Sequence, residues 1–277
     1  MRPIFSTLIA FVAVACAAPA ASDDTVAPTT AGDASSTTAP STTIPVLGAE
    51  VAGRWAHLDV VAYEEGDLKT LIISFGFNDF EVVNGRVIDS ASFCFAEQRT
   101  NQPIETSISD AATQAIRPPS TAIKVDLIDG RVRIRRAATP TPVGIVLADP
   151  AVESLPTDPN DPRIVDDDGD GKPGITVKIV VGDALEGELY LARREIFAYE
   201  AFLVSPDEIV GTVEDRSEQL VIGASDPIFT TAGSNWVQYA DRSKSPIFLR
   251  RVTGDWDCAR LARERDSLFP VIPEIDW

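Results

Sequence analysis

Nine consecutive residues, 166–174, read DDDGDGKPG and place carboxylates at alternate positions. Asp166, Asp168 and Asp170 can each supply an oxygen ligand to Ca²⁺, and the backbone carbonyl of Lys172 can supply a fourth. Carboxylates this close together repel one another unless a cation or water separates them. The pattern therefore predicts a structural calcium site. The alternative is an acidic, solvated turn before a strand that begins at Ile175.

This acidic run departs from the EF-hand pattern at one important position. An EF-hand loop ends with a bidentate Glu at its twelfth residue, which here is Val177, and no helical pattern flanks the run. A further ligand would have to come from the preceding proline-rich stretch, whose acidic residues are Asp149, Glu153, Asp158 and Asp161. Because an ordered connection as long as 149–174 needs something to hold it, we expect the ion to have a structural role and not a catalytic one.

His57 is the single histidine of the chain, so a Ser-His-Asp or Cys-His arrangement would have to be built around it. Alternation along a strand puts His57 on the same side as Trp55, Asp59, Val61 and Tyr63. A carboxyl group near an imidazole can orient it for proton transfer. A partly buried, hydrogen-bonded histidine on a strand is the commoner situation. We therefore predict a protein without enzymatic activity, with a hydrolase that uses His57 and Asp59 as the alternative.

A second group of charges, Arg193-Arg194-Glu195 with Glu200, lies on one expected strand. Paired carboxylates can serve a glycosidase, but alternating charges on a solvated sheet face account for the same pattern. The sequence has no glycine-rich loop of the kind that cradles phosphates, so no nucleotide-dependent enzyme is indicated.

The elements that must position these residues are mostly antiparallel β-strands. Beyond Ala49 the apolar residues recur with period two between closely spaced turn signals. Asn84-Gly85 and Asp129-Gly130 each predict a hairpin with a two-residue turn, because these residues tolerate positive φ. The second hairpin sets Leu127 opposite Val132, Val125 opposite Ile134, Asp126 opposite Arg133, and Lys124 opposite Arg135.

Further strands are expected at 55–63, 68–77, 92–97, 143–148, 175–181, 188–203, 208–215, 219–223 and 246–252. Two short helices are expected, one capped by Ser107 and running to Ile116, the other capped by Asp255 and running to Leu268. This order predicts a mostly β fold, a single antiparallel β-barrel or sandwich with one or two short helices, and favours the barrel.

The first twenty residues have the pattern of a signal sequence: Arg2 near the amino terminus, an apolar run over 4–15, and small residues around Cys16. The apolar run is too short for a stable membrane span. Residues 13–16, AVAC, resemble the lipobox of bacterial lipoproteins, with Ala13 where Leu is usual. The resemblance implies a lipid anchor on Cys16, on the outer face of the cytoplasmic membrane or in the periplasm or outer membrane. The alternative is cleavage after Ala20, which releases a soluble secreted protein.

The chain has 3 cysteines, an odd number for an exported protein. Assigning Cys16 to the lipid leaves Cys94 and Cys258 as a disulfide pair that fastens the C-terminal segment to an early strand. Two buried free thiols are the alternative.

Composition divides the chain into a signal sequence (1–20), a tether (21–48) and one β domain (49–277) that contains the acidic loop 149–174. The tether is rich in Thr, Ser and Pro and has too few large apolar residues to repay the entropy of ordering. The formal net charge of −18 excludes nucleic acid as a partner, because a polyanion is repelled at long range.

Two resemblances rest on these residues. Gly53-Arg54-Trp55 looks like the G-x-W motif of lipocalins, whose Trp packs at the closed end of an eight-stranded barrel under an Arg from the last strand. The resemblance implies a lipocalin-like barrel closed by Trp55 together with Arg250 or Arg251, and a disulfide that ties the C-terminal segment to the barrel.

The runs DDDGDGKPGITVKIVV, GELYLARRE and SEQLVIGASDP resemble a group of uncharacterised exported bacterial proteins, often lipoproteins, with a D-x-D-G-D-G-x-P-G loop. That resemblance implies an envelope location and no particular activity. We therefore expect a membrane-tethered, calcium-braced binding or structural module that holds an apolar small ligand or an envelope protein partner.

Overall fold

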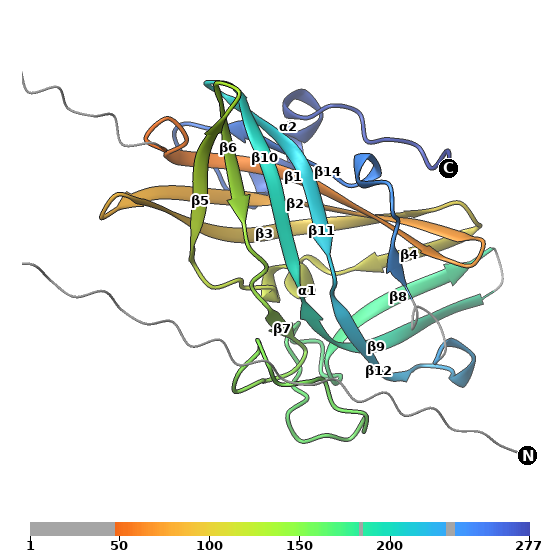
Figure 1. Ribbon diagram of the computed structural model, residues 1–277. Coiled ribbons are helices and arrows are strands. Elements are labelled where there is room, and N and C mark those ends of the chain that lie inside the picture. The colour runs from red at the N-terminus through yellow and green to blue at the C-terminus, as the bar shows by residue number, and fades with distance from the viewer. Residues whose placement is uncertain (1–47, 183–184, 231–235) are drawn as a thin grey trace, which may run out of the picture. The chain divides into compact units, whose positions relative to one another are not determined.

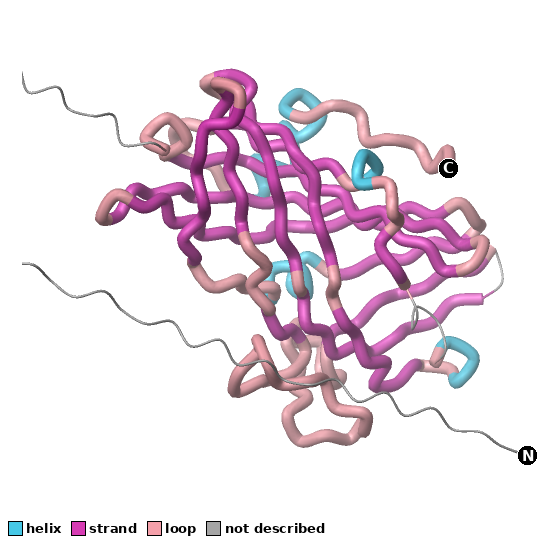
Figure 2. The backbone as a smooth tube through the Cα atoms, in the orientation of Figure 1, coloured by secondary structure: helices cyan, strands magenta, loops and turns pink. Residues whose placement is uncertain are grey.

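Residues 48–182, 185–230 and 236–277 are described by the computed structural model of the protein, which is built mostly from antiparallel strands (Figure 1). The predicted signal sequence, Cys16 and the tether up to residue 47 lie outside the described residues. The predicted fold class is confirmed, and Figure 2 shows how little of the described chain is helical. No helix in these ranges is long and apolar enough to cross a membrane.

The strands are β1 (Gly53–Glu65), β2 (Leu68–Val83), β3 (Arg86–Thr100), β4 (Ile104–Ile108), β5 (Thr121–Ile128), β6 (Arg131–Arg136), β7 (Thr141–Val143), β8 (Ile175–Val181), β9 (Leu185–Glu195), β10 (Phe197–Ser205), β11 (Glu208–Asp215), β12 (Glu218–Ala224), β13 (Val237–Gln238) and β14 (Pro246–Arg251). The α-helices are α1 (Asp110–Ala115) and α2 (Cys258–Leu268), and two short 3₁₀ turns are η1 (Pro227–Phe229) and η2 (Arg242–Lys244).

Eight strands form a closed ring, in the order β1, β2, β3, β5, β6, β10, β11 and β14, which pairs again with β1. The neighbours in this ring are antiparallel. The ring is uneven, because β2 pairs along the whole of β1 whereas β3 and β5 pair only over 87–89 and 121–123. A barrel-like interior results, into which alternate residues of each strand point.

A second sheet continues from the ring in the order β12, β9, β8 and β4, with β7 also paired to β9 (Figure 1). Strand β9 leads into β10 across Ile196, and β11 leads into β12 across residues 216–217. One long hairpin therefore belongs to both sheets. The inner face of the second sheet faces the same interior as the ring, which follows from the residues that line the cavity described below.

Strand β1 is buried on both faces, which explains its almost unbroken apolar sequence. Its even-numbered residues, such as Leu58 and Val60, pack in an apolar cluster with Leu261 of α2 and with Phe269. The odd-numbered residues face the interior of the ring. Helix α2 therefore covers the outside of the ring.

The predicted disulfide is confirmed: Cys94 of β3 and Cys258 of α2 are bonded, with Cα atoms 5.2 Å apart. The predicted cap of this helix is wrong by two residues, because the Asp257 side chain, not that of Asp255, accepts the Arg260 backbone N–H at 2.7 Å.

The first helix also begins later than predicted. Ser109 caps α1 and accepts the Ala112 N–H at 3.1 Å, because Ser107 and Ile108 belong to strand β4 and pair with β8. The alternating polar and apolar residues of 104–108 fit a strand with one exposed face, and the sequence analysis did not identify it.

Both predicted hairpins form. Asn84 and Asp129 adopt positive φ at their turns, each followed by a Gly that also has positive φ. The β5–β6 register is the predicted one, including Lys124 opposite Arg135. Asp126 relieves that conflict, since it accepts hydrogen bonds from Arg133 and Arg135.

Two other expected strands differ from the structure. Strand β7 ends at Val143, and the following residues form only an isolated bridge between Ile145 and Ile164. The expected strand over 188–203 is two strands, β9 and β10, because the strand is interrupted at Ile196. The Ile196 N–H donates to the Ser217 hydroxyl and not to a neighbouring strand. This interruption separates β9, in the second sheet, from β10, in the ring.

Candidate functional site

A cavity of about 330 Å³ lies between the interior of the ring and the inner face of the second sheet. Alternate residues of β4, β8 and β9 supply much of its apolar wall: Ile104, Ile108, Ile175, Val177, Ile179, Val181, Leu189 and Leu191. The period of two fixes this arrangement, because every second residue of each strand faces the same side. The opposite face of β8, which carries Thr176, is turned towards the acidic loop.

A polar network joins residues from five strands of the ring, and all of them except Asp89 line the cavity. His57 Nδ1 lies 2.8 Å from Asn78 Oδ1, and the Asn78 amide donates to Asp89 Oδ1 at 2.8 Å. The Tyr199 hydroxyl donates to Asp89 Oδ2 at 3.0 Å, and Arg136 Nε lies 3.0 Å from the same oxygen. All five residues are buried, so this network fixes the position of each polar group by contact with the next.

The network depends on a close approach of two strands. An added Cβ at Gly76 would lie 2.1 Å from the Ser92 carbonyl oxygen and 2.8 Å from Cε1 of His57. Glycine is therefore required at this point for the imidazole of His57 to lie against β2.

A second polar cluster surrounds Asp215 at the end of β11. The Tyr63 hydroxyl donates to Asp215 Oδ2 at 2.6 Å, and the Ser217 hydroxyl lies 2.6 Å from Asp215 Oδ1. Glu195 is 2.8 Å from the same hydroxyl and accepts a hydrogen bond from Arg193 Nε at 2.7 Å. Asp215 is thus held by neutral donors, and the Arg193 guanidinium is paired with Glu195.

His57 and Asp59 lie side by side between these clusters, each only 2% exposed. Burial lowers the pKa of His57 to about 4, with the Asn78 hydrogen bond acting in the opposite direction. Burial raises the pKa of Asp59 to about 8, and the Asp215 and Glu195 carboxylates act in the same direction. At neutral pH His57 is therefore neutral and Asp59 holds a proton, so the two side chains, 3.7 Å apart, form no ion pair.

Sequence alternation correctly placed His57 and Asp59 together, but their geometry provides little for hydrolysis. In the described part of the chain, Nε2 of His57 has no hydrogen-bond partner, so no hydroxyl or thiol nucleophile is bonded to it. Glu195 and Glu200 do not converge either. Glu195 lines the cavity, whereas Glu200 is exposed on the outer face of β10 and lies 3.7 Å from Arg133.

Besides Arg136 Nε, which lies 3.0 Å from Asp89 Oδ2, five buried polar atoms of cavity-lining residues have no hydrogen-bond partner among the described residues. They are His57 Nε2, Thr106 Oγ1, Arg136 Nη2, Thr139 Oγ1 and Trp236 Nε1. An unpartnered buried polar atom costs about 1–3 kcal/mol, so such atoms are normally paired. Five of them around one cavity form the arrangement expected where a bound molecule or ordered water supplies the missing partners.

Trp55 and Arg251 lie together near the start of β1. The Trp55 side chain is fully buried, its Nε1 donates to the Val51 carbonyl at 2.8 Å, and the Arg251 guanidinium carbon lies 4.2 Å from the centre of its ring. Arg251 also donates to the Glu50 carbonyl at 2.6 Å. Arg250 points elsewhere and donates to the Leu268 carbonyl at 2.9 Å. Of the two arginines considered from the sequence, Arg251 is therefore the one that contacts Trp55.

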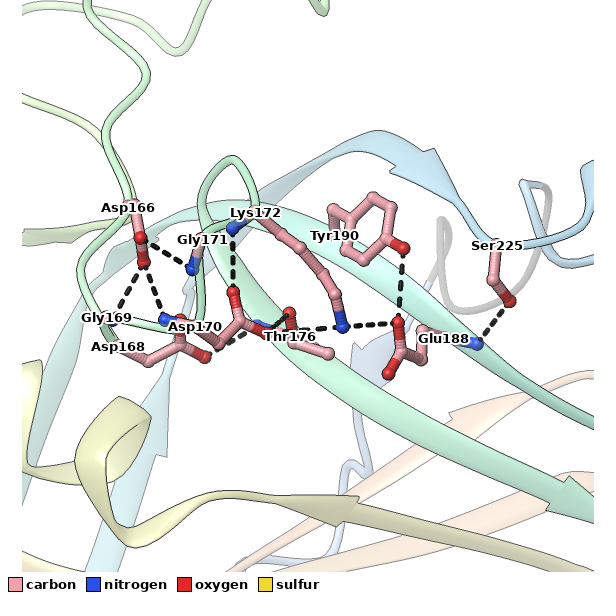
Figure 3. A network of polar contacts seen from close by, with 10 residues as sticks. All are labelled: Asp166, Asp168, Gly169, Asp170, Gly171, Lys172, Thr176, Glu188, Tyr190 and Ser225. Atoms are coloured by element: carbon pink, nitrogen blue, oxygen red, sulfur yellow. Dashed lines mark hydrogen bonds and ion pairs between the residues drawn. The ribbon is translucent and has the colours of Figure 1, made fainter.

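The acidic loop is ordered around Asp166 (Figure 3). Asp166 accepts the backbone N–H groups of Gly169, Asp170 and Gly171 at 2.7–3.2 Å. One carboxylate oxygen from each of Asp166, Asp168 and Asp170 lies within 4.8 Å of the others. The alternation read from the sequence therefore does bring these carboxylates together.

The other two carboxylates of this cluster contact β8 and a lysine. Asp168 accepts the Thr176 N–H at 2.9 Å, and Asp170 accepts the Thr176 hydroxyl at 2.6 Å (Figure 3). Lys172 Nζ donates to Glu188 at 2.6 Å and lies 3.5 Å from Asp170 Oδ2. The lysine thus brings one positive charge to the cluster, and sequence reasoning assigned it only a backbone carbonyl.

The donor set fits part of a calcium site. Asp168 Oδ1 is buried without a hydrogen-bond partner among the described residues, and burial raises the pKa of Asp168, as expected for a carboxylate that lacks a nearby cation. The acidic residues proposed to close the site do not reach it: Glu153 and Asp161 both bond Arg163. Among the described residues, no further carboxylate joins the cluster to serve as a bidentate ligand.

Arginines hold the long loop in place. Arg163 bonds Glu153 and Asp161, and the largely buried Arg194 donates to the carbonyls of Pro150 and Glu153. These contacts give the connection 149–174 a brace that does not require an ion.

Sequence reasoning missed most of the cavity's polar residues, chiefly Asn78, Asp89, Arg136, Tyr199 and Asp215. A signal for them exists: Asp89, Arg136 and Asp215 each occupy an inward position two residues after a buried Val87, Ile134 or Val213. A charged residue that falls at an inward-facing position of a strand, where buried apolar residues are expected, indicates an interior polar site.

Comparisons with protein-family models, with curated proteins and with solved structures found no match.

Proposed function

We propose that this chain is an exported β-barrel protein, tethered to a membrane by lipid on Cys16, that binds one small molecule in its cavity without catalysing a reaction on it. The observation that carries the proposal is the cavity itself, with its five buried polar atoms that lack partners among the described residues. A cavity of this volume is within the range of small-molecule sites, about 300–1,000 Å³.

The two ends of the cavity favour an amphipathic ligand. The walls from β4, β8 and β9 are apolar, so they favour the apolar body of a ligand through the hydrophobic effect. The groups around His57 and Arg136 offer hydrogen bonds to its polar end. A small molecule accounts for both features, whereas a protein partner would need an exposed surface.

The proposed location rests on the sequence and on the disulfide. A bond between Cys94 and Cys258 is typical of proteins that mature in an oxidising compartment, which supports export. A mature protein whose free amino terminus is Ala21 would contradict the lipid tether.

The binding proposal predicts that a neutral apolar fluorophore, N-phenyl-1-naphthylamine, will bind with a stoichiometry of one and brighten as it leaves water. Replacing Thr106 by Trp should weaken this binding at least tenfold, because Thr106 lines the cavity and the larger side chain would fill part of it. A fluorescence titration measures both.

The matched control is Glu105→Trp, on the same strand but with its side chain exposed. We expect it to bind the fluorophore like the wild-type protein. Absence of saturable binding by the folded wild-type protein, or equal effects of the two tryptophans, would contradict a ligand site in this cavity.

We also propose that calcium binds weakly to Asp166, Asp168, Asp170 and the Lys172 carbonyl and braces the acidic loop. The close carboxylates and the unpartnered Asp168 oxygen support this proposal. The missing bidentate carboxylate and the nearby Lys172 ammonium limit the affinity.

Calcium is accordingly expected to raise the thermal midpoint of protein first stripped with EDTA. The gain in the free energy of unfolding is about 2.7 kcal/mol at a calcium concentration one hundred times the dissociation constant. Asp168→Asn should abolish the gain, whereas Asp158→Asn, in the same loop but outside the cluster, should keep it. A midpoint that calcium leaves unchanged in the wild-type protein would rule out this role.

A further inference from the structure

Asp59 is the least satisfied of the buried carboxyl groups that line the cavity. It lines the cavity and is 2% exposed, yet it accepts no hydrogen bond from the residues that the structure describes. His57 Nε2 lies 3.7 Å from Asp59 Oδ2 and also lacks a hydrogen-bond partner there. A buried carboxyl group in this condition is rare unless something else pairs with it.

The titratable groups in and beside the cavity come from several strands, and their charges do not balance. Among the described residues, four carboxyl groups of the interior belong to Asp59 on β1, Asp89 on β3, Glu195 on β9 and Asp215 on β11. Two guanidinium groups belong to Arg136 on β6 and Arg193 on β9. The other titratable groups at the cavity are His57, Tyr63 and Tyr199, together with the less buried Glu65 and Glu97.

Both guanidinium groups are already committed to other carboxylates. Arg136 lies against Asp89 and Arg193 donates to Glu195. Asp215 has neutral donors in Tyr63 and Ser217, so Asp59 is the one of these four carboxyl groups with neither a cation nor a donor among the described residues. The ionised form of Asp59 therefore has no counter-charge there.

Aromatic rings line the same cavity as this carboxyl group. Tyr63 is on the same face of β1, and its ring centre lies 5.6 Å from that of Trp236, which also lines the cavity. The faces of such rings attract cations.

We propose, on the basis of the ligand-binding function above, that the ligand is an organic cation: an amine whose ammonium group pairs with the Asp59 carboxylate and whose apolar body lies against β8 and β9. An anionic ligand would add to the excess of interior carboxylates. A neutral ligand would give the ionised form of Asp59 no counter-charge.

The pairing makes binding depend on pH. Because burial raises the pKa of Asp59 to about 8, the free protein must release a proton from Asp59 before an ammonium group can pair with it. The affinity for an amine should therefore rise about fifty-fold between pH 6 and pH 8, as the ionised fraction of Asp59 grows. His57, with a pKa of about 4, stays neutral throughout this window.

The test is displacement of N-phenyl-1-naphthylamine by three molecules of equal chain length: octylamine, 1-octanol and octanoate. At pH 8 we expect octylamine to bind at least tenfold more tightly than 1-octanol, and octanoate to bind most weakly. Asp59→Asn should reduce the octylamine affinity to that of 1-octanol, leave the 1-octanol affinity unchanged and remove the pH dependence.

Glu200→Gln, which removes a carboxylate from the exposed outer face of β10, is the matched control and should change none of the affinities. If 1-octanol binds and octylamine binds no more tightly, the inference is wrong while the ligand-binding function stands. If neither the fluorophore nor any of the three molecules binds, both are wrong. Should Asp59→Asn fail to fold, the wild-type protein decides, since amine binding that does not vary between pH 6 and 8 overturns the proposal.

Discussion

Replacing Cys94 and Cys258 together by alanine will lower the free energy of unfolding by roughly 2–5 kcal/mol. The bond joins residues separated by 164 positions, so its removal frees a long closed loop in the unfolded chain. Alanine is the suitable replacement because Cys94 is buried in an apolar cluster, where a serine hydroxyl would lack a partner.

The loss should also be visible locally at α2. Leu261 and Phe269 bury apolar surface against the outer face of β1 and β2, and the disulfide holds the first residue of the helix against β3. Without it we expect faster hydrogen exchange of the α2 amides than of the amides in β1.

Urea denaturation with and without dithiothreitol measures the effect and provides its control. Reduction should lower the midpoint of the wild-type protein and leave that of the double-alanine variant unchanged. A wild-type midpoint that does not move, with the free thiols verified by alkylation, would show that α2 packing alone holds the C-terminal segment.

Local patterns predicted much of this fold, and their success has a physical basis. The Asp129-Gly130 turn fixed the register of β5 and β6 because a two-residue turn leaves one pairing of the flanking strands. Strands β8 and β11 have the predicted bounds, because glycine or charged residues border the segment in which apolar residues recur with period two.

The sequence predictions were wrong where contacts between distant segments determine the secondary structure. The segment 104–108 became β4 because the exposed edge of β8 was available for pairing, and no local pattern reveals an edge elsewhere in the chain. The interruption between β9 and β10 at Ile196 likewise depends on Ser217, which reaches Ile196 only when β11 and β12 are paired with β10 and β9.

The site divides in the same way. The spacing of Asp166, Asp168 and Asp170 is local, and the structure brings these side chains together as predicted. The Asp89–Arg136 pair is not local: its members meet because β3, β5 and β6 curve into a ring, and sequence reasoning had no means of pairing them.

Replacing Arg136 by methionine is expected to cost roughly 3–5 kcal/mol of the free energy of unfolding, because it leaves Asp89 as a buried carboxylate without its cation. Methionine keeps most of the side-chain volume, so the decrease in the free energy of unfolding comes more from the removed charge than from altered packing. The Asn78 and Tyr199 donors remain and cannot neutralise the carboxylate.

The cost should grow with pH. Burial raises the pKa of Asp89 in the folded wild-type protein, and the Arg136 guanidinium opposes that rise. Without the arginine, the folded variant holds a proton on Asp89 that the unfolded chain releases near pH 4. The folded state then binds more protons than the unfolded state, so the free energy of unfolding falls as pH rises, by up to about 1.4 kcal/mol per unit. Urea denaturation at pH 5 and pH 8 should therefore show the larger deficit at pH 8.

Arg135→Met is the matched control, because Arg135 precedes Arg136 on the same strand but points outward to Asp126 and Glu200. An exposed pair of this kind contributes about 0–1 kcal/mol, and Asp126 keeps its contact with Arg133. Equal losses in the two variants, or a deficit for Arg136→Met that does not change with pH, would show that Asp89 is not held ionised by Arg136.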